Sequence, residues 1–216
     1  PITANIVLQS DGVWQLNEAE EAAKYGAKPG QYRIKDYNGD YAYNDKDLII
    51  YGKRTPDITG GFTNTFTYKN FDLAVHAYYS FGAKQSGYFV ENNLPGGERF
   101  NRLKVNYWTP ENPSNEYAQP GNTGPSGGVG VTSKTGKYSR QCLNTDFVKV
   151  AYITLGYTFN KRIIGNYLNR LRVYATVQNP FTFTGFKGID PEYPSGWPGN
   201  TDFMTSNWTF GVNVSF

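Results

Sequence analysis

Alternation of apolar and polar side chains near the carboxy-terminal end constrains the fold most strongly. Over residues 207–216, Trp208, Phe210, Val212 and Val214 are apolar, and the residues between them are polar or glycine. Successive side chains of a β-strand point to opposite faces, so the pattern predicts a strand with one apolar and one polar face. The segment has the roughly 9–11 residues that a tilted strand needs to cross a bilayer.

Four earlier segments repeat this alternation, namely 61–68, 71–81, 147–159 and 171–178. The first two are separated only by Lys69 and Asn70, which predicts a β-hairpin. In the third, Lys149 interrupts a face that otherwise carries residues such as Phe147 and Ile153. We therefore predict an all-β fold in which antiparallel strands form part of a transmembrane β-barrel. Eight strands are about the minimum for an outer-membrane barrel, so these segments would belong to a larger one.

The connections between the predicted strands differ strongly in length. Residues 82–146 and 179–206 are rich in proline and glycine and predict long loops, whereas Lys69-Asn70 is a short turn. Outer-membrane barrels place long loops outside and short turns in the periplasm, which would leave the carboxy terminus periplasmic. Residues 1–60 are expected to be an extracellular loop region with a short helix that begins after Asn17.

The alternation also assigns faces. We expect one face to contact membrane lipid and the opposite face to line the lumen. The residues predicted to face the lumen are His76, Tyr78, Arg172 and Tyr174. His76 is expected to be a hydrogen-bonded wall residue rather than a functional group.

Composition agrees with a barrel and leaves one alternative open. Aromatic residues make up 17% of the chain and mean hydropathy is −0.58, as expected when only alternate residues meet lipid. A secreted β-sandwich-type carbohydrate-binding or adhesion domain without membrane contact would share this composition. The net charge of +3, without long charged runs, argues against a nucleic-acid partner. The chain starts at Pro1 without a signal peptide, so we expect it to be the rear portion of a longer protein.

An acidic segment resembles a calcium-binding loop. Asp36, Asn38, Asp40 and Asp47 stand at positions where a Ca²⁺ loop places oxygen ligands. The pattern departs from the template at Tyr41, where glycine is usual. The alternative is an acidic surface loop that binds no metal.

No group of residues predicts catalysis, and we expect the chain not to be an enzyme. His76 and Cys142 are the only residues of their kinds and stand in unlike contexts, so a Cys/His nucleophile pair has little support. Asp190 and Glu192 flank Pro191; paired carboxylates can hydrolyse glycosides, but we expect these two to brace a loop.

Aromatic residues in the predicted external loops are possible contacts for a substrate or a protein partner, since aromatic faces stack on sugars and anchor interfaces. Packing inside the loop is the alternative for each. These residues are Trp108, Phe186, Tyr193 and Trp197.

Several motifs resemble the carboxy-terminal third of SusC/RagA-type TonB-dependent transporters. Among them are Gly12-Val13-Trp14-Gln15, Lys28-Pro29-Gly30-Gln31-Tyr32 and Trp108-Thr109-Pro110-Glu111-Asn112-Pro113. The most specific are Gln178-Asn179-Pro180-Phe181-Thr182 and the following Gly188-Ile189-Asp190-Pro191-Glu192. The resemblance covers essentially the whole chain in the expected order.

This resemblance implies a bacterial outer-membrane importer of oligosaccharides or peptides. Its fold would be a 22-stranded barrel, closed by an amino-terminal plug that contacts the TonB complex. A SusD-like lipoprotein would cover the extracellular mouth, and the remainder of the barrel would complete the wall. The terminal Phe216 looks like the signal recognised by the outer-membrane assembly machinery.

Overall fold

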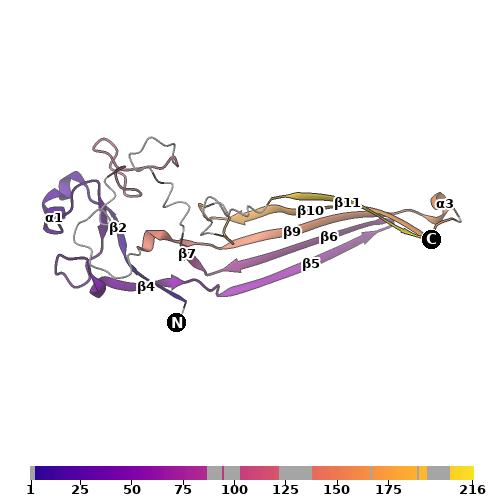
Figure 1. Ribbon diagram of the computed structural model, residues 1–216, viewed down its shortest axis with the longest axis horizontal. Helices are drawn as coiled ribbons and strands as arrows, with labels where there is room; N and C mark the ends of the chain where they lie inside the picture. Colours follow the sequence, from indigo (N-terminus) through magenta and orange to yellow (C-terminus); the bar gives the residue numbers. More distant parts are fainter. Residues whose placement is uncertain are drawn as a thin grey trace. The chain divides into compact units, whose positions relative to one another are not determined.

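The alternating segments form one antiparallel sheet in the computed structural model (Figure 1). The structure describes residues 3–86, 94, 103–121, 138–165, 167–188, 190–193 and 205–216. Its chain divides into two compact units, which are treated separately below. Unit 1 comprises residues 1–55, 84–143 and 194–199, and unit 2 comprises 56–83, 144–193 and 200–216.

Unit 2 is a five-stranded sheet in the order β11-β10-β9-β6-β5, with every neighbouring pair antiparallel. The strands lie side by side in Figure 1. They span Ile58–Tyr68 (β5), Phe71–Phe81 (β6), Phe147–Thr158 (β9), Arg170–Thr184 (β10) and Asn207–Ser215 (β11).

Two short connections lie at the same end of this sheet, which we call the turn end. Lys69 and Asn70 join β5 to β6, and Lys69 adopts a left-handed φ of 54° to close the hairpin. The short helix α3 (Lys161–Ile164) lies between β9 and β10. At the opposite end, which we call the loop end, long segments join β6 to β9 and β10 to β11.

One extra residue in β9 changes the assignment of faces made from the sequence. His76 pairs with Tyr152 and the next residue, Ala77, pairs with Val150, so Ala151 is the extra residue of a β-bulge. The bulge shifts the alternation of β9 by one position. Lys149 therefore lies on the polar face opposite Tyr78, and Phe147 moves to that face with it. The prediction that Phe147 belongs to the apolar face was wrong, because a simple period of two does not include a bulge.

Strand β10 is longer than predicted. It continues to Thr184, whereas the sequence predicted a loop from Asn179 onward. The register between β10 and β9 is irregular between Gln178 and Phe181, where Asn179 has a φ of 50°. Proline is tolerated in a strand at such an irregularity because its missing N–H removes no regular ladder bond. Pro180 and a left-handed asparagine therefore mark a distortion within the strand and not its end.

Unit 1 is built from short strands and helical turns, although residues 1–60 were expected to be mainly loop. Strand β1 (Ala4–Leu8) pairs with β4 (Leu48–Lys53), and β2 (Ser10–Val13) pairs with β3 (Tyr32–Ile34). These strands are too short to give a clear alternation. The remaining elements are η1 (Leu16–Glu18), α1 (Ala19–Lys24), η2 (Asp45–Asp47), β7 (Lys84–Ser86), η3 (Ser139–Gln141) and β8 (Cys142–Asn144), which pairs with β7.

The segment 82–146 was predicted to be one long loop, but parts of it complete the core of unit 1. Trp108 and Ala118 pack with Val13 and Tyr32, and Tyr138 packs with a second cluster that includes Leu8. Aromatic side chains within a proline-rich segment thus supply core that secondary-structure patterns do not reveal. Within the part of the chain described, no helix is long and apolar enough to cross a membrane.

Two glycines of unit 1 test how tightly this core is packed. Gly30 and Gly39 both have left-handed backbones, with φ of 87° and 71°. A methyl group at Gly30 would lie 2.7 Å from the Trp108 ring, whereas one at Gly39 would meet nothing within 4 Å. Gly39→Ala should cost about 1–2 kcal/mol of stability through backbone strain alone. Gly30→Ala should cost about 1–3 kcal/mol more because of overpacking. Unfolding followed by tryptophan fluorescence measures both; equal losses would contradict this packing.

Candidate functional site: the polar face of the five-stranded sheet

The two faces of the sheet differ sharply in chemistry. Cross-strand pairing places Leu73 with Leu155, Val75 with Ile153, and Val173 with Val212 on one face, which we call the apolar face. Many of its large side chains are exposed, such as Phe210 at 76%, whereas Leu73, Val75 and Ile153 are partly buried.

The opposite face, which we call the polar face, carries all four residues predicted to face a lumen. His76 and Tyr78 reach it from β6, and Arg172 and Tyr174 reach it from β10. It also carries a series of threonines. One of them, Thr63, pairs with His76, and the Thr154 and Thr176 hydroxyls lie 2.8 Å apart.

A buried lysine lies toward the loop end of the polar face. Lys149 is 2% exposed, and its ammonium donates to both carboxylate oxygens of Asp190 at 2.9 and 3.0 Å. It also binds Glu192, which in turn accepts a 2.8 Å hydrogen bond from the Tyr78 hydroxyl. The backbone N–H of Glu192 donates to Asp190 as well, at 2.9 Å. One cation therefore attaches segment 190–193 to the sheet.

This cluster supports the interpretation of Asp190 and Glu192 as a loop brace. A buried ammonium pays a large desolvation penalty unless ion pairs and hydrogen bonds compensate it, and here two carboxylates do so. Both carboxylates are engaged by the same lysine. Neither is placed as a separate acid or base for glycoside hydrolysis.

In the middle of the face, side chains of neighbouring strands contact one another. The Nδ1 atom of His76 lies 2.8 Å from the Thr63 hydroxyl, and its ring stacks on Tyr152 with centroids 5.4 Å apart. Both partners come from neighbouring strands. His76 thus makes a hydrogen bond to a neighbouring strand, and its position facing a lumen stays a prediction.

Toward the turn end, an ion pair crosses the sheet from β10 to β6. Arg172 donates to Asp72 through Nε at 2.9 Å and through Nη2 at 2.5 Å. The strand between them is β9, and Gly156 lies beneath the pair: a methyl group there would come within 2.6 Å of the Asp72 carboxylate. The absence of a side chain at Gly156 is what lets the two charges meet.

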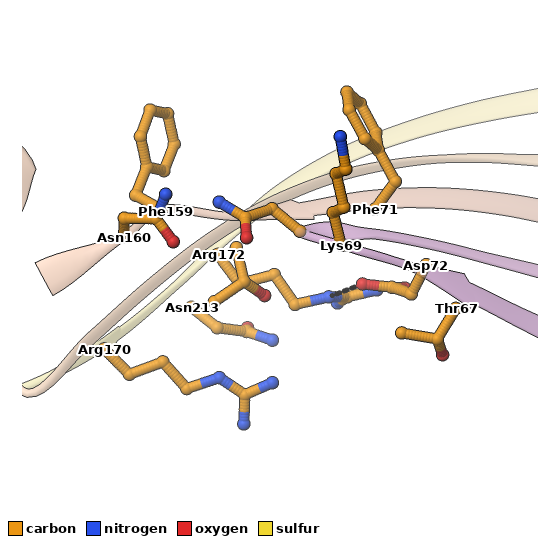
Figure 2. Close-up of a pocket in the computed structure, with 11 residues that line it drawn as sticks. Thr67, Lys69, Phe71, Asp72, Phe159, Asn160, Arg170, Arg172 and Asn213 are labelled. Carbon is orange, nitrogen blue, oxygen red and sulfur yellow. Dashed lines mark hydrogen bonds and ion pairs between the residues drawn. The ribbon is translucent and has the colours of Figure 1, made fainter.

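The ion pair borders an open pocket of about 520 Å³ at the turn end, shown in Figure 2. Its charged lining residues are Lys69, Arg170, Arg172 and Asp72. Lys69 and Phe71 point to one side in this view, whereas Arg170 and Asn213 lie on the side of the Arg172–Asp72 pair. Sequence analysis identified Arg172 but missed Asp72 and Arg170. The alternation could have identified them. Asp72 and Arg172 are charged residues on the polar side of predicted strands, and Arg170 takes the same side once the fourth strand is extended by one residue.

The acidic segment of unit 1 does not assemble a metal site. Asp36 accepts hydrogen bonds from the backbone N–H groups of Asn38, Gly39 and Tyr41. Asp47 is fully buried and accepts from the N–H groups of two other residues of the loop. Within the described ranges, no group of three or more acidic, histidine or cysteine side chains could hold a metal ion. In this structure these side chains organise the loop itself, which favours the acidic-loop alternative.

The backbone of Tyr41 and the surroundings of two ionisable side chains characterise this loop. Tyr41 has a φ of 58°, so it adopts the left-handed conformation for which the calcium-loop template uses glycine. A hydrogen bond from Asn38 holds the pKa of Asp40 below its usual value. Burial, and then the charge of Asp36, raise the pKa of Tyr25 to about 12. Tyr25 also stacks on Tyr43 with ring centroids 5.0 Å apart, which connects the loop to the core.

The four aromatic candidates are placed differently. Trp108 is 3% exposed and donates from Nε1 to Gln15 at 2.9 Å, so it belongs to the core of unit 1 and not to a contact surface. Phe186 is also buried, beside Gly188. Tyr193 is 52% exposed and remains available for contact. Trp197 lies outside the described residues. Phe216 is exposed at the end of the chain, and its part in assembly stays a prediction.

Comparison with known sequences relates the chain to outer-membrane receptors. No protein-family model matches it. The TonB-dependent receptor SusC of Bacteroides thetaiotaomicron is 30% identical over 198 residues, which cover 88% of this chain and 18% of that protein. The TonB-dependent receptor P3 of Formosa agariphila is 28% identical over 165 residues, covering 76% of this chain and 16% of that protein. The chain thus spans less than a fifth of the length of these relatives.

The fold of this chain also resembles that of solved structures. The RagAB peptide transporter matches with a TM-score of 0.69 at 20% identity, covering 99% of this chain and 22% of the matched chain. The RagAB peptide importer in its open-open state matches with a TM-score of 0.61 over 98% of this chain.

The Lys149 cluster yields a prediction about stability. Lys149→Met should lower stability by about 3–5 kcal/mol, since it leaves the Asp190 and Glu192 carboxylates without their cation. Neutralising both carboxylates in the same protein, as Asp190→Asn and Glu192→Gln, should restore most of the loss. Chemical unfolding of the three proteins measures the difference. A lysine that only fills space would give the same loss with and without the carboxylates.

Proposed function

We propose that this chain, which is similar over most of its length to part of a SusC/RagA-type TonB-dependent receptor, forms a section of the barrel wall of an outer-membrane importer. In this proposal the apolar face of the sheet contacts membrane lipid and the polar face lines the lumen. The whole protein would import a nutrient and catalyse no covalent chemistry.

The observation that carries the proposal is the difference between the two faces. A soluble sandwich must cover its apolar face with a second layer, because contiguous exposed apolar surface is costly in water. In this sheet the apolar side chains remain accessible, including Phe181, Trp208 and Val212. Accessible apolar side chains on one face and threonines, charges and tyrosines on the other suit a wall between lipid and water.

Chain connectivity supports an orientation. The segments that join β6 to β9 and β10 to β11 both leave from the loop end, while the turn end has only short connections. In outer-membrane barrels the long loops are extracellular, so unit 1 and the 185–206 connection would lie outside the cell. Such loops usually carry function on a scaffold of strands.

The partners follow from the same proposal. A SusD-like lipoprotein would cover the extracellular mouth, and energy would come through the TonB complex acting on a plug outside this chain. The substrate would be an oligosaccharide or a peptide. The solved RagAB structures are described as peptide transporters or importers, which favours a peptide as the first substrate class to test. Tyr193 is the exposed aromatic residue that we would test first for contact with lid or substrate.

Spin labels on one strand test the assignment of the faces. Val212 and Asn213 are neighbours on β11 and both are exposed, so labels at these sites differ only in the face that they occupy. In the reconstituted receptor, a label at position 212 should be relaxed by oxygen, which concentrates in lipid, and a label at 213 by a water-soluble nickel complex.

The opposite accessibility would reverse the faces, and water at both positions would favour the secreted sandwich. A second pair, Val173 and Tyr174 on β10, checks that the result does not come from the edge position of β11.

A further inference from the structure

An open groove of about 490 Å³ lies on the apolar face toward the turn end, and we call it the apolar groove. Its floor follows β10, where Val173 and Ala175 are small, and its walls are larger side chains of β9 and β11. Ala175, for example, lies between Leu155 and Phe210 in the register. A row of short side chains between two rows of long ones can hold a flexible hydrocarbon chain along the strand.

The turn end of the apolar groove is bordered by aromatic side chains. Phe71 and Tyr157 line the groove with ring centroids 4.8 Å apart, and Phe159 meets the Tyr157 ring edge-on at 5.0 Å. The Tyr157 hydroxyl accepts a 3.4 Å hydrogen bond from the side-chain amide of Asn70 in the hairpin turn. In membrane barrels, aromatic residues with a polar end gather where hydrocarbon meets the headgroups. The polar end of the groove therefore lies at the hairpin turn.

Lys69 brings a positive charge to this end of the groove. Tyr68 and Phe71 are cross-strand partners on the apolar face, and the Lys69 ammonium lies 5.3 Å from the centre of the Tyr68 ring. Figure 2 shows Lys69 extending to the same side as Phe71. Asp72, the acidic residue in the lining of the neighbouring turn-end pocket, binds Arg172 on the polar face instead. Lys69 therefore offers its charge on the apolar side of the sheet.

The helix α3 adds two more cations at the turn end. Lys161 and Arg162 are both exposed, and the next residue, Ile163, is 64% exposed. Exposed basic and apolar side chains in one short segment are typical of a membrane surface. Each Lys or Arg near an anionic lipid surface contributes about 1 kcal/mol of attraction. The turn end is thus suited to anionic headgroups.

We infer that the apolar groove binds an anionic glycerophospholipid, with an acyl chain along β10 and the phosphate at Lys69. This inference rests on the proposed function, in which the apolar face contacts membrane lipid. The Lys69 ammonium, the Asn70 amide and the Tyr157 hydroxyl supply N–H and O–H donors for the phosphate oxygens. All three groups lie at the end of the groove where an acyl chain would join its headgroup.

Charge distinguishes this occupant from the alternatives. A zwitterionic phospholipid carries its own cation, which the lysines and arginine of the turn end repel. A second copy of the chain in the same membrane would bring its turn-end cations beside those of the first. An anionic phospholipid satisfies both the apolar groove and the cations.

Photoaffinity labelling in the full-length receptor tests the inference. The receptor is reconstituted in phosphatidylcholine vesicles that contain a trace of phosphatidylglycerol or phosphatidylcholine with a diazirine in one acyl chain. After irradiation, digestion and mass spectrometry locate the labelled peptides. We expect phosphatidylglycerol to label the peptides that contain Ala175 and Phe210 severalfold more than phosphatidylcholine does, because only its headgroup is held at Lys69.

Two pairs of variants separate the headgroup contact from the groove. Lys69→Gln should reduce phosphatidylglycerol labelling to the phosphatidylcholine level, whereas Lys187→Gln, at an exposed cation beyond the loop end of β10, should not. Ala175→Phe should reduce labelling by filling the groove. Val177→Phe, two residues further along the same face and outside the lining, is its matched control.

Three results would overturn the inference: equal labelling by the two lipids, a phosphatidylglycerol preference that survives Lys69→Gln, or protection of the groove peptides from both lipids by a protein that covers them. A spin label at Val212, in a preparation without probe, distinguishes this failure from a failure of the proposed function. Lipid contact at Val212 without a phosphatidylglycerol preference removes the binding site alone. Water contact at Val212 removes the lipid-facing assignment on which both depend.

Discussion

The extra residue Ala151 in β9 determines what each face of the sheet contains. Without it, a strict period of two would place Lys149 among apolar side chains of β6 and β10, where an ammonium has no partner. The bulge moves Lys149 to the polar face opposite Tyr78, within reach of Asp190 and Glu192. The same shift leaves Val148 and Val150 on the apolar face, opposite Tyr79 and Ala77. One inserted residue thus keeps one face free of charge and gives the other its anchor for segment 190–193.

Charged residues of the polar face have two different structural roles. Near the loop end, Lys149 is buried and fully engaged, so its ion pairs fix the path of the chain after β10. Near the turn end, the Arg172–Asp72 pair spans β9 over Gly156 and links β10 to β6. These compensated charges therefore connect neighbouring elements of the polar face.

Much of the sheet could be predicted from the sequence, because a strand with one apolar and one polar face shows a regular alternation of side chains. The segment 71–81 is an example: β6 has the bounds and faces that its pattern indicates. Lys149 and Asn179 could not be interpreted in this way, since a bulge and a left-handed residue interrupt the period without ending the strand. Trp108 was misplaced for another reason. Its core partners, Val13 and Tyr32, are far away in sequence, and no local pattern reveals such packing. The acidic loop shows a third limit, because carboxylates at the spacing of metal ligands can equally accept backbone N–H groups.

The arrangement of connections bears on the proposed transport function. Every long connection of the sheet leaves from the loop end, and segment 190–193 is drawn back onto the polar face there by Lys149. In the proposed barrel, this would place a braced segment in the lumen near its outer opening, on a wall whose paired strands keep the position of that brace fixed.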